Sequence, residues 1–222
     1  MKISPTLTEV KEIAKTGKYD ILPVSCEILS DFITPIEAMR ILQNVSTHCY
    51  LLESAQANEA WGRYTFLGYD PKLEINCIDG HMKLGKLSVE TENPSEYIRQ
   101  ILSEYKSPKF DYLPSFTGGL VGYFSYDYLG YKEKSIRGKA RDTEDFKDVD
   151  LMLFDKVIAF DNLCQKIILI VNMSLDAPET GYNKAIVELK QLRELLMHGE
   201  KKQNMGGKLL GEVTPLFEKE GA

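Results

Sequence analysis

The sequence lacks the residue patterns from which metal centres and disulfide frameworks are built. Its four cysteines stand far apart, without the C-x-x-C spacing of zinc or dithiol sites. His81 lies four residues after Cys77, but no histidine lies three or four residues from a second histidine. We therefore predict free, buried thiols and no metal site within this segment. The residues concerned are Cys26, Cys49, Cys77, Cys164, His48, His81 and His198.

Basic runs and long apolar runs are absent as well. The net charge is −6 with a pI near 5.3, and no Lys/Arg stretch is interleaved with aromatic residues, which argues against a nucleic-acid partner. The longest apolar runs, such as 167–171, are too short to cross a bilayer, and residues 1–5 lack the apolar core of a signal peptide. A chain of 222 residues with 43% hydrophobic content can bury a sizeable core. We expect a cytoplasmic globular protein without a membrane partner.

Two helix starts are marked by Thr-Pro and Asn-Pro signals. In 34–37, Thr34 can cap the helix while Glu37 reaches back as a capping box, and an apolar stripe follows at helical spacing. The segment 93–96 repeats the device before a second stripe over 98–105. Weaker signals predict a helix from Ser4-Pro5, with proline at the first helical position, and a longer one from Thr180 to Gly199 that packs across a sheet.

Strands are predicted between these helices, in consecutive hairpins. Segments 72–78 and 81–89 flank Asp79-Gly80, a dipeptide that tolerates the positive φ angles of a tight turn. Segments 150–160 and 165–172 flank Asp161-Asn162. Because hairpins produce antiparallel sheets and no regular strand-helix-strand alternation is present, the predicted fold class is α+β. Two polar stretches are predicted as a solvated loop (132–148) and a linker (199–211).

Two segments carry polar residues that suit ligand binding. The run 48–54 is an apolar strand that ends in Glu53-Ser54, and both side chains can accept hydrogen bonds from an ammonium group. On residue type alone, the polar end of an exposed strand is favoured about three to one, because the hydrogen-bond inventory fits any surface loop. Arg63, in the run 62–68, can clamp a carboxylate, although sequence alone favours a surface ion pair.

A third segment, 116–127, is rich in glycine and aromatic residues. No Lys-Ser/Thr follows the glycines, and aromatic residues stand where a nucleotide-binding helix would begin. The glycines are better explained by the close approach of another backbone, or by a bulge in a strand packed on both sides.

In their order and separation, these segments resemble the amino-terminal domain of anthranilate synthase component I. The resemblance spans nearly the whole chain and rests on runs 24–31, 51–54, 62–68 and 118–127 together with Thr34-Pro35; each motif is weak alone, but their ordered set is specific. It implies that residues 1–198 form that regulatory domain. Residues 199–222 are then a linker and the start of the chorismate-binding domain, so the chain is part of a larger two-domain fold.

The resemblance also implies activity, partners and site residues. Family members are lyases of tryptophan biosynthesis that convert chorismate and ammonia into anthranilate and pyruvate, with magnesium bound in the carboxy-terminal domain and ammonia supplied by a glutamine amidotransferase subunit. The present chain is therefore expected to hold no catalytic or metal-binding residue and to be inactive alone. In the family, the amino-terminal domain binds the feedback inhibitor tryptophan, through residues that correspond here to Leu52, Glu53 and Ser54, with Arg63 close to a basic effector-site position.

Two alternatives remain at this point. The related component of aminodeoxychorismate synthase, which serves folate synthesis, shares the fold, but its members often depart from Leu-Leu-Glu-Ser, so the intact Glu53-Ser54 pair favours anthranilate synthase by about four to one. A free-standing binding module is a different class, and the apolar pair Leu216-Phe217 near the end of the chain argues against it. Reading the gene beyond codon 222 discriminates between these alternatives.

Overall fold

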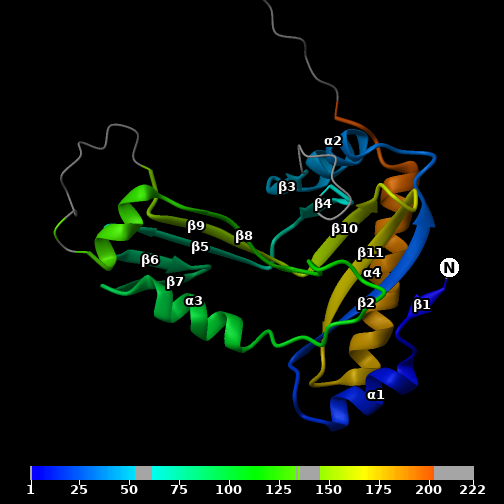
Figure 1. Ribbon diagram of the computed structural model, residues 1–222, viewed down its shortest axis with the longest axis horizontal. Coiled ribbons are helices and arrows are strands. Elements are labelled where there is room, and N and C mark those ends of the chain that lie inside the picture. Colours follow the sequence, from blue (N-terminus) through cyan, green and yellow to red (C-terminus); the bar gives the residue numbers. More distant parts are fainter. Residues whose placement is uncertain (1, 54–61, 134, 136–145, 203–222) are drawn as a thin grey trace, which may run out of the picture.

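A computed structural model describes residues 2–53, 62–133, 135 and 146–202, and the structural statements below concern these ranges. The chain forms two antiparallel sheets with helices packed on them (Figure 1), which confirms the predicted α+β class. Sheet A has the order β1-β2-β11-β10-β4-β3. Its strands are β1 (Ile3–Ser4), β2 (Ile21–Leu29), β3 (Cys49–Leu52), β4 (Tyr64–Tyr69), β10 (Lys156–Asp161) and β11 (Lys166–Ser174).

Sheet B has the order β7-β6-β5-β9-β8. Its strands are β5 (Leu73–Ile78), β6 (His81–Leu84), β7 (Leu87–Glu90), β8 (Gly119–Phe124) and β9 (Val149–Phe154). The helices are α1 (Leu7–Lys15), α2 (Pro35–Val45), α3 (Pro94–Ser103) and α4 (Pro178–His198), with a 3-10 helix η1 (Tyr126–Tyr131) after β8.

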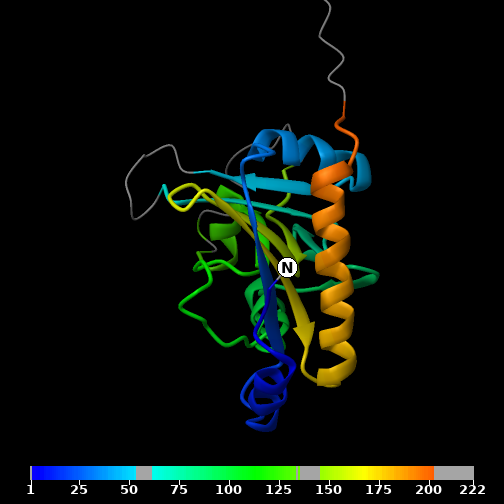
Figure 2. The same cartoon turned by 90° about the vertical axis from the view of Figure 1, so that its right-hand side faces the viewer.

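The main core lies between sheet A and α4, which runs along one face of the sheet (Figure 2). Leu189 and Leu192 of α4 pack there with Val24 of β2 and Leu169 of β11, all of them fully or almost fully buried. Each such side chain contributes about 1.5–3 kcal/mol of hydrophobic stabilisation. The prediction that this helix packs across a sheet is confirmed, although α4 begins at Pro178 rather than after Thr180.

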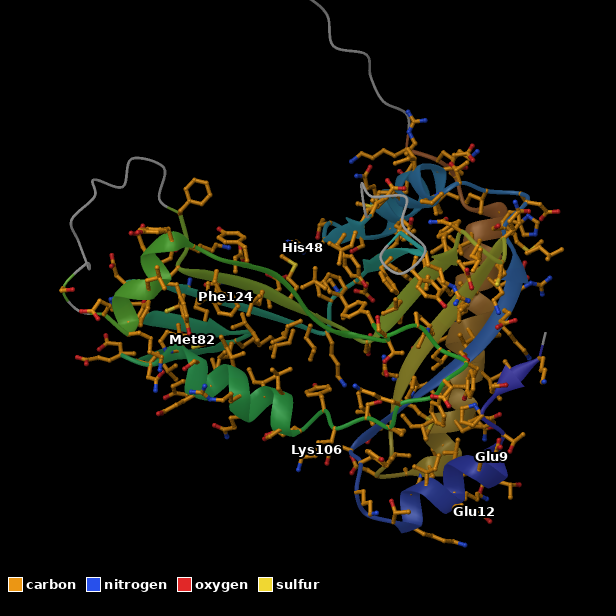
Figure 3. The ribbon with its side chains drawn as sticks, in the orientation of Figure 1. Glu9, Glu12, His48, Met82, Lys106 and Phe124 are labelled. Carbon is orange, nitrogen blue, oxygen red and sulfur yellow. The ribbon has the colours of Figure 1, made fainter. Side chains whose placement is uncertain are left out.

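The opposite face of sheet A is covered by the segment that follows α3. Leu113 and Phe116 from this segment pack on Val157 of β10 and Ile170 of β11. Sheet B has its own core, in which Ile75 and Met82 pack against Ile98 of α3. Figure 3 labels Met82 and Phe124 in this sheet, away from α4.

The two sheets are joined where β9 passes into β10 at Asp155. The sequence predicted one strand over 150–160, and this is wrong, because residues 149–154 belong to sheet B and residues 156–161 to sheet A. Both halves have the same apolar, β-rich composition, so periodicity does not reveal the break. The predicted strand 81–89 is likewise divided, because Gly85, at φ 60°, makes a turn between β6 and β7.

The helix starts agree with the sequence in most details. Thr34 and Glu37 form the predicted capping box of α2. Asn93 precedes α3 as predicted, but its side chain makes no capping bond to the backbone and instead donates to Glu96. The prediction of proline at the first position of the first helix is wrong, because α1 begins two residues later behind a Thr6 capping box.

Turn and linker predictions have mixed outcomes. Asp79 and Gly80 adopt φ angles of 47° and 84°, which confirms the tight turn of the β5–β6 hairpin. Most of the loop predicted over 132–148 and of the linker over 199–211 lies outside the described residues. The first linker residues pack on α2, where the Lys202 N–H donates to the Arg40 carbonyl and Lys201 pairs with Glu37.

Candidate functional site

The predicted effector residues begin at the end of β3, the edge strand of sheet A. Cys49 and Leu51 pack toward the main core on the side of the sheet that α2 covers, so strand alternation directs Tyr50 and Leu52 to the opposite face. Leu52 pairs in register with Phe66 of β4 and is 46% exposed. Glu53 follows it and is exposed, and Ser54 lies outside the described residues. The strand thus presents an apolar side chain and then a carboxylate at its exposed end.

Arg63 forms a two-pronged ion pair with Asp161, the last residue of β10. Its Nε donates to Oδ1 at 3.1 Å and its Nη2 to Oδ2 at 2.8 Å, and the Asp161 side chain is fully buried. Asp161 also accepts the N–H groups of Leu163 and Cys164 in the β10–β11 turn. This carboxylate therefore fixes Arg63 and the turn together.

The charge state of the pair follows from these contacts. Burial by itself would raise the pKa of Asp161, but the hydrogen bonds from Arg63 and from the Cys164 N–H outweigh it and hold the pKa below its usual value. The Arg63 pKa is raised, mainly by its hydrogen bonds to Asp161. Arg63 therefore pairs with a buried carboxylate and does not form the weak, exposed ion pair that the sequence favoured. A guanidinium has five N–H donors, so the groups not bound to Asp161 leave the predicted effector role open.

Aromatic side chains line the face of sheet A that Leu52 shares. Tyr50 packs edge-on against Phe154, with ring centroids 4.7 Å apart, and Phe116 lies 6.3 Å from Tyr50 and 5.5 Å from Phe66. Tyr64 continues the row, 5.8 Å from Phe66, with the Arg63 guanidinium 4.9 Å from its ring. The sequence did not reveal this cluster. The one local sign of the cluster in the sequence is that Tyr64 and Phe66 are two residues apart, which places both aromatic rings on one face of a strand.

Tyr50 is an unusual member of the cluster. Its residue is only 8% exposed, and its hydroxyl makes no hydrogen bond within the described structure. Its ring lies directly over Gly68 of β4, where a Cβ would fall 2.2 Å from Cε1. Burial raises the pKa of this phenol, so it remains protonated. A buried hydroxyl without a partner lowers the stability of the fold. This hydroxyl lies in β3, two residues before Leu52.

The glycine-rich segment serves backbone packing, as predicted. Gly122, at φ 151°, would place a Cβ 2.0 Å from the Asp150 carbonyl oxygen of β9. Gly118, at φ 146°, would place one 3.0 Å from the Phe154 oxygen. The alternative of a strand packed on both sides does not hold in the described structure, because β8 is an edge strand and its second half is exposed.

The cysteines and histidines do not gather. All four cysteines are free, as predicted, but Cys164 is exposed because it lies in the β10–β11 turn, and Cys49 is half-buried. Each histidine lies 3.5 Å from a glutamate oxygen, in the pairs His48–Glu74, His81–Glu90 and His198–Glu194. The described ranges contain no group of three metal-ligating side chains. In the same ranges, no helix has the length and hydropathy needed to cross a bilayer.

Together these features define the class of protein: an α+β protein with two antiparallel sheets, whose candidate site combines a strand-end carboxylate with an aromatic sheet face. No family model matches the chain. Among curated proteins, anthranilate synthase component 1 of Acetivibrio thermocellus is 34% identical over 198 residues, which cover 86% of this chain and 39% of that protein. The same component of Pseudomonas aeruginosa is 35% identical over 194 residues, or 85% of this chain and 39% of that protein.

The chain is therefore a relative of anthranilate synthase component 1 and matches an amino-terminal part of it. It spans about two fifths of the length of these curated relatives. Among solved structures, anthranilate synthase component I from Streptococcus pneumoniae TIGR4 is similar over 75% of this chain and 36% of that chain, with 25% sequence identity and a TM-score of 0.49.

Proposed function

We propose that this chain is the regulatory, amino-terminal part of an anthranilate synthase component I of tryptophan biosynthesis. The observation that carries the proposal is the match to curated relatives at 34–35% identity over about 85% of the chain, within about 39% of their length. In this proposal the whole protein is a lyase that converts chorismate and ammonia into anthranilate and pyruvate. A glutamine amidotransferase subunit is its partner and supplies the ammonia.

Chorismate and magnesium bind, in this proposal, within the part of the relatives that this chain does not match. The chain alone is then inactive. The purified 222-residue protein should produce no anthranilate fluorescence from chorismate, ammonia and magnesium, and sustained turnover by it would overturn the assignment.

The tryptophan site is proposed at the end of β3. A buried ammonium group needs acceptors, which Glu53 and Ser54 supply, and hydrogen bonds to charged groups contribute roughly 1.5–3 kcal/mol each. Leu52, 46% exposed beside Phe66, offers apolar contact for an indole ring. Arg63, fixed by Asp161, keeps further N–H donors for the effector carboxylate.

Tryptophan titration calorimetry tests this site in the polypeptide that the complete gene encodes. Ser54→Phe should weaken binding by about tenfold to a hundredfold, since each 1.4 kcal/mol is a factor of ten. Inhibition should then need more tryptophan, while the rate without inhibitor stays near normal, because the effector acts through a coupling free energy between sites. Ser88→Phe, at an exposed position of β7 in sheet B, serves as a control for the bulk of the added ring.

Equal tryptophan affinity in wild type and Ser54→Phe would remove Ser54 from the site. The 222-residue chain alone should bind tryptophan weakly, because family members complete the pocket with residues outside this part. Tight binding by the chain alone would contradict the shared pocket while leaving the assignment of Glu53 and Ser54 intact.

A further inference from the structure

A cavity of about 120 Å³ lies at the joint between the two sheets, away from the end of β3. Its walls come from the end of β9, the Thr117–Gly119 segment before β8, and the segment after α3. That last wall is tied to sheet A, because Asp20 N–H donates to the Lys106 carbonyl at 2.9 Å and Lys106 N–H donates to the Asp20 carboxylate at 3.0 Å. Figure 3 labels Lys106 on this segment. The cavity is therefore framed by fixed backbone.

The lining of the cavity is apolar at one end and polar at the other. Ile21, Leu102, Leu153 and Phe154 form apolar walls. The cavity adjoins an open groove of about 460 Å³ along β11 and α4, and the four residues common to both are polar. These shared residues are Lys72, Asp155, Asn172 and Ser174. An apolar end with a polar mouth suits an amphipathic small molecule.

Two opposite charges at this mouth are without ion-pair partners among the described residues. In the groove, Lys156 pairs with Asp70 at 2.9 Å and Lys184 with Glu188 at 3.7 Å. Lys72 and Asp155 make no such pair within the described ranges, and the Lys72 ammonium lies 5.4 Å from the centroid of the Tyr105 ring. The mouth thus offers one cation and one anion to a ligand.

Asn172 adds an acceptor whose orientation is fixed. Its Nδ2 donates to the carbonyl oxygens of Thr117 at 2.6 Å and Asp155 at 3.1 Å, which only the amide nitrogen can do. Its Oδ1 makes no hydrogen bond to the described residues. Gly118 maintains this arrangement, because a Cβ there would lie 2.5 Å from the Asn172 Nδ2.

We propose that this cavity binds a free amino acid with a short apolar side chain. The carboxylate faces Lys72, the ammonium group faces Asp155 and Asn172 Oδ1, and the side chain occupies the apolar end. An apolar cavity of about 150 Å³ takes one benzene molecule, so about 120 Å³ accommodates a branched aliphatic chain and excludes an indole ring. The site is therefore separate from the tryptophan site proposed at Glu53.

L-Valine is the probe, and its binding to the complete 222-residue chain is followed by calorimetry and by amide chemical shifts. Binding should weaken about tenfold or more in Lys72→Met and in Asp155→Asn, because each loses a charged hydrogen-bond partner. Lys83→Met, at an exposed position of β6 outside the cavity, is the matched control and should bind L-valine like wild type. Leu102→Trp should block binding by filling the apolar end, with both charges kept.

Isovalerate carries only the carboxylate and isobutylamine only the ammonium group. The two compounds therefore test the two charged contacts at the mouth separately. Both should bind at least tenfold more weakly than L-valine. Equal affinity of isovalerate and L-valine would overturn the role of Asp155, and unchanged binding of L-valine by Lys72→Met or Leu102→Trp would overturn the site. Absence of L-valine binding at millimolar concentration would also overturn it. Tryptophan titration of the same substitutions, made in the polypeptide that the complete gene encodes, reports on the β3 site independently.

Discussion

At the scale of single residues, two buried polar groups of sheet A face opposite energetic situations. Asp161 is fully buried but receives two hydrogen bonds from Arg63 and two from backbone N–H groups. The hydroxyl of Tyr50 is buried and receives none within the described structure. Burial costs a polar group free energy unless protein partners replace the water that it loses. This cost is compensated for the Asp161 carboxylate and is not compensated for the Tyr50 hydroxyl.

The Tyr50 hydroxyl gives a prediction about stability. Tyr50→Phe should leave the free energy of unfolding unchanged or raise it by up to about 1–3 kcal/mol, because it removes a buried group that has no partner. Tyr182→Phe is the matched control. Its hydroxyl donates to the Pro5 carbonyl at 3.0 Å, so its removal should lower stability by about 0.5–1.5 kcal/mol. Urea unfolding of both variants measures the difference, and a clear loss of stability in Tyr50→Phe would contradict the unpaired state of this hydroxyl.

Asp161 gives a prediction about acid stability. Its pKa is lowered in the folded state, so the folded state binds fewer protons than the unfolded state and is stabilised at pH above the unfolded value of about 3.9. This contribution should disappear as the pH falls through the lowered pKa. Unfolding measured from pH 7 down to pH 2 should show a steeper loss of stability in wild type than in Asp161→Asn. Parallel curves for the two proteins would show that Asp161 does not carry this proton linkage.

At the scale of elements, the close contact between β8 and β9 requires a residue without a side chain at Gly122. Gly122 approaches the Asp150 carbonyl so closely that no Cβ fits, whereas Gly17, at φ 61° after α1, has nothing within 4 Å of its would-be Cβ. Both glycines have a positive φ, but only at Gly122 would a clash with the neighbouring backbone add to the cost of a side chain. Strand β8 is held at the edge of sheet B by this close approach along its pairing with β9.

Alanine substitutions test this distinction. Gly17→Ala should lower the free energy of unfolding by about 1–2 kcal/mol, because a residue with a Cβ is strained in the left-handed conformation. Gly122→Ala should cost more, because the clash with Asp150 adds roughly 1–3 kcal/mol of overpacking strain or forces β8 away from β9. Thermal unfolding of the two variants supplies the comparison. A Gly122→Ala variant as stable as Gly17→Ala would mean that the strands separate at no cost.

At the scale of the whole molecule, sheet B carries apolar side chains that the described residues leave uncovered. Tyr126 is 80% exposed, and Tyr123, Phe124 and Leu129 are each at least 40% exposed on β8 and η1. Figure 1 shows β8 running from the joint with sheet A to the end of the molecule away from α4, where η1 follows it. Monomeric proteins seldom expose apolar patches beyond ~300–600 Å².

This surface predicts association of the 222-residue chain. Sedimentation at rising concentration should show self-association, and a hydrophobic dye should bind. The double substitution of Tyr126 and Leu129 by serine should reduce both effects, whereas Leu87→Ser, an exposed position at the far edge of sheet B, should not. Monomeric wild-type protein that binds no dye would favour a self-sufficient module over part of a larger fold.

The sequence by itself determined the features that depend on neighbouring residues. The capping box at Thr34 and Glu37, the tight turn at Asp79-Gly80 and the close-packed glycines of 118–122 depend on backbone conformation within a few residues, so composition and spacing reveal them. The division of 149–161 between two sheets, the pairing of Arg63 with Asp161 and the packing of Tyr50 on Phe154 were decided only by the tertiary structure. Each joins positions whose contact depends on how the sheets fold together, and local propensity carries no information about that. The cavity at the joint belongs to the same group, because its walls meet only where the chain passes from β9 of sheet B into β10 of sheet A.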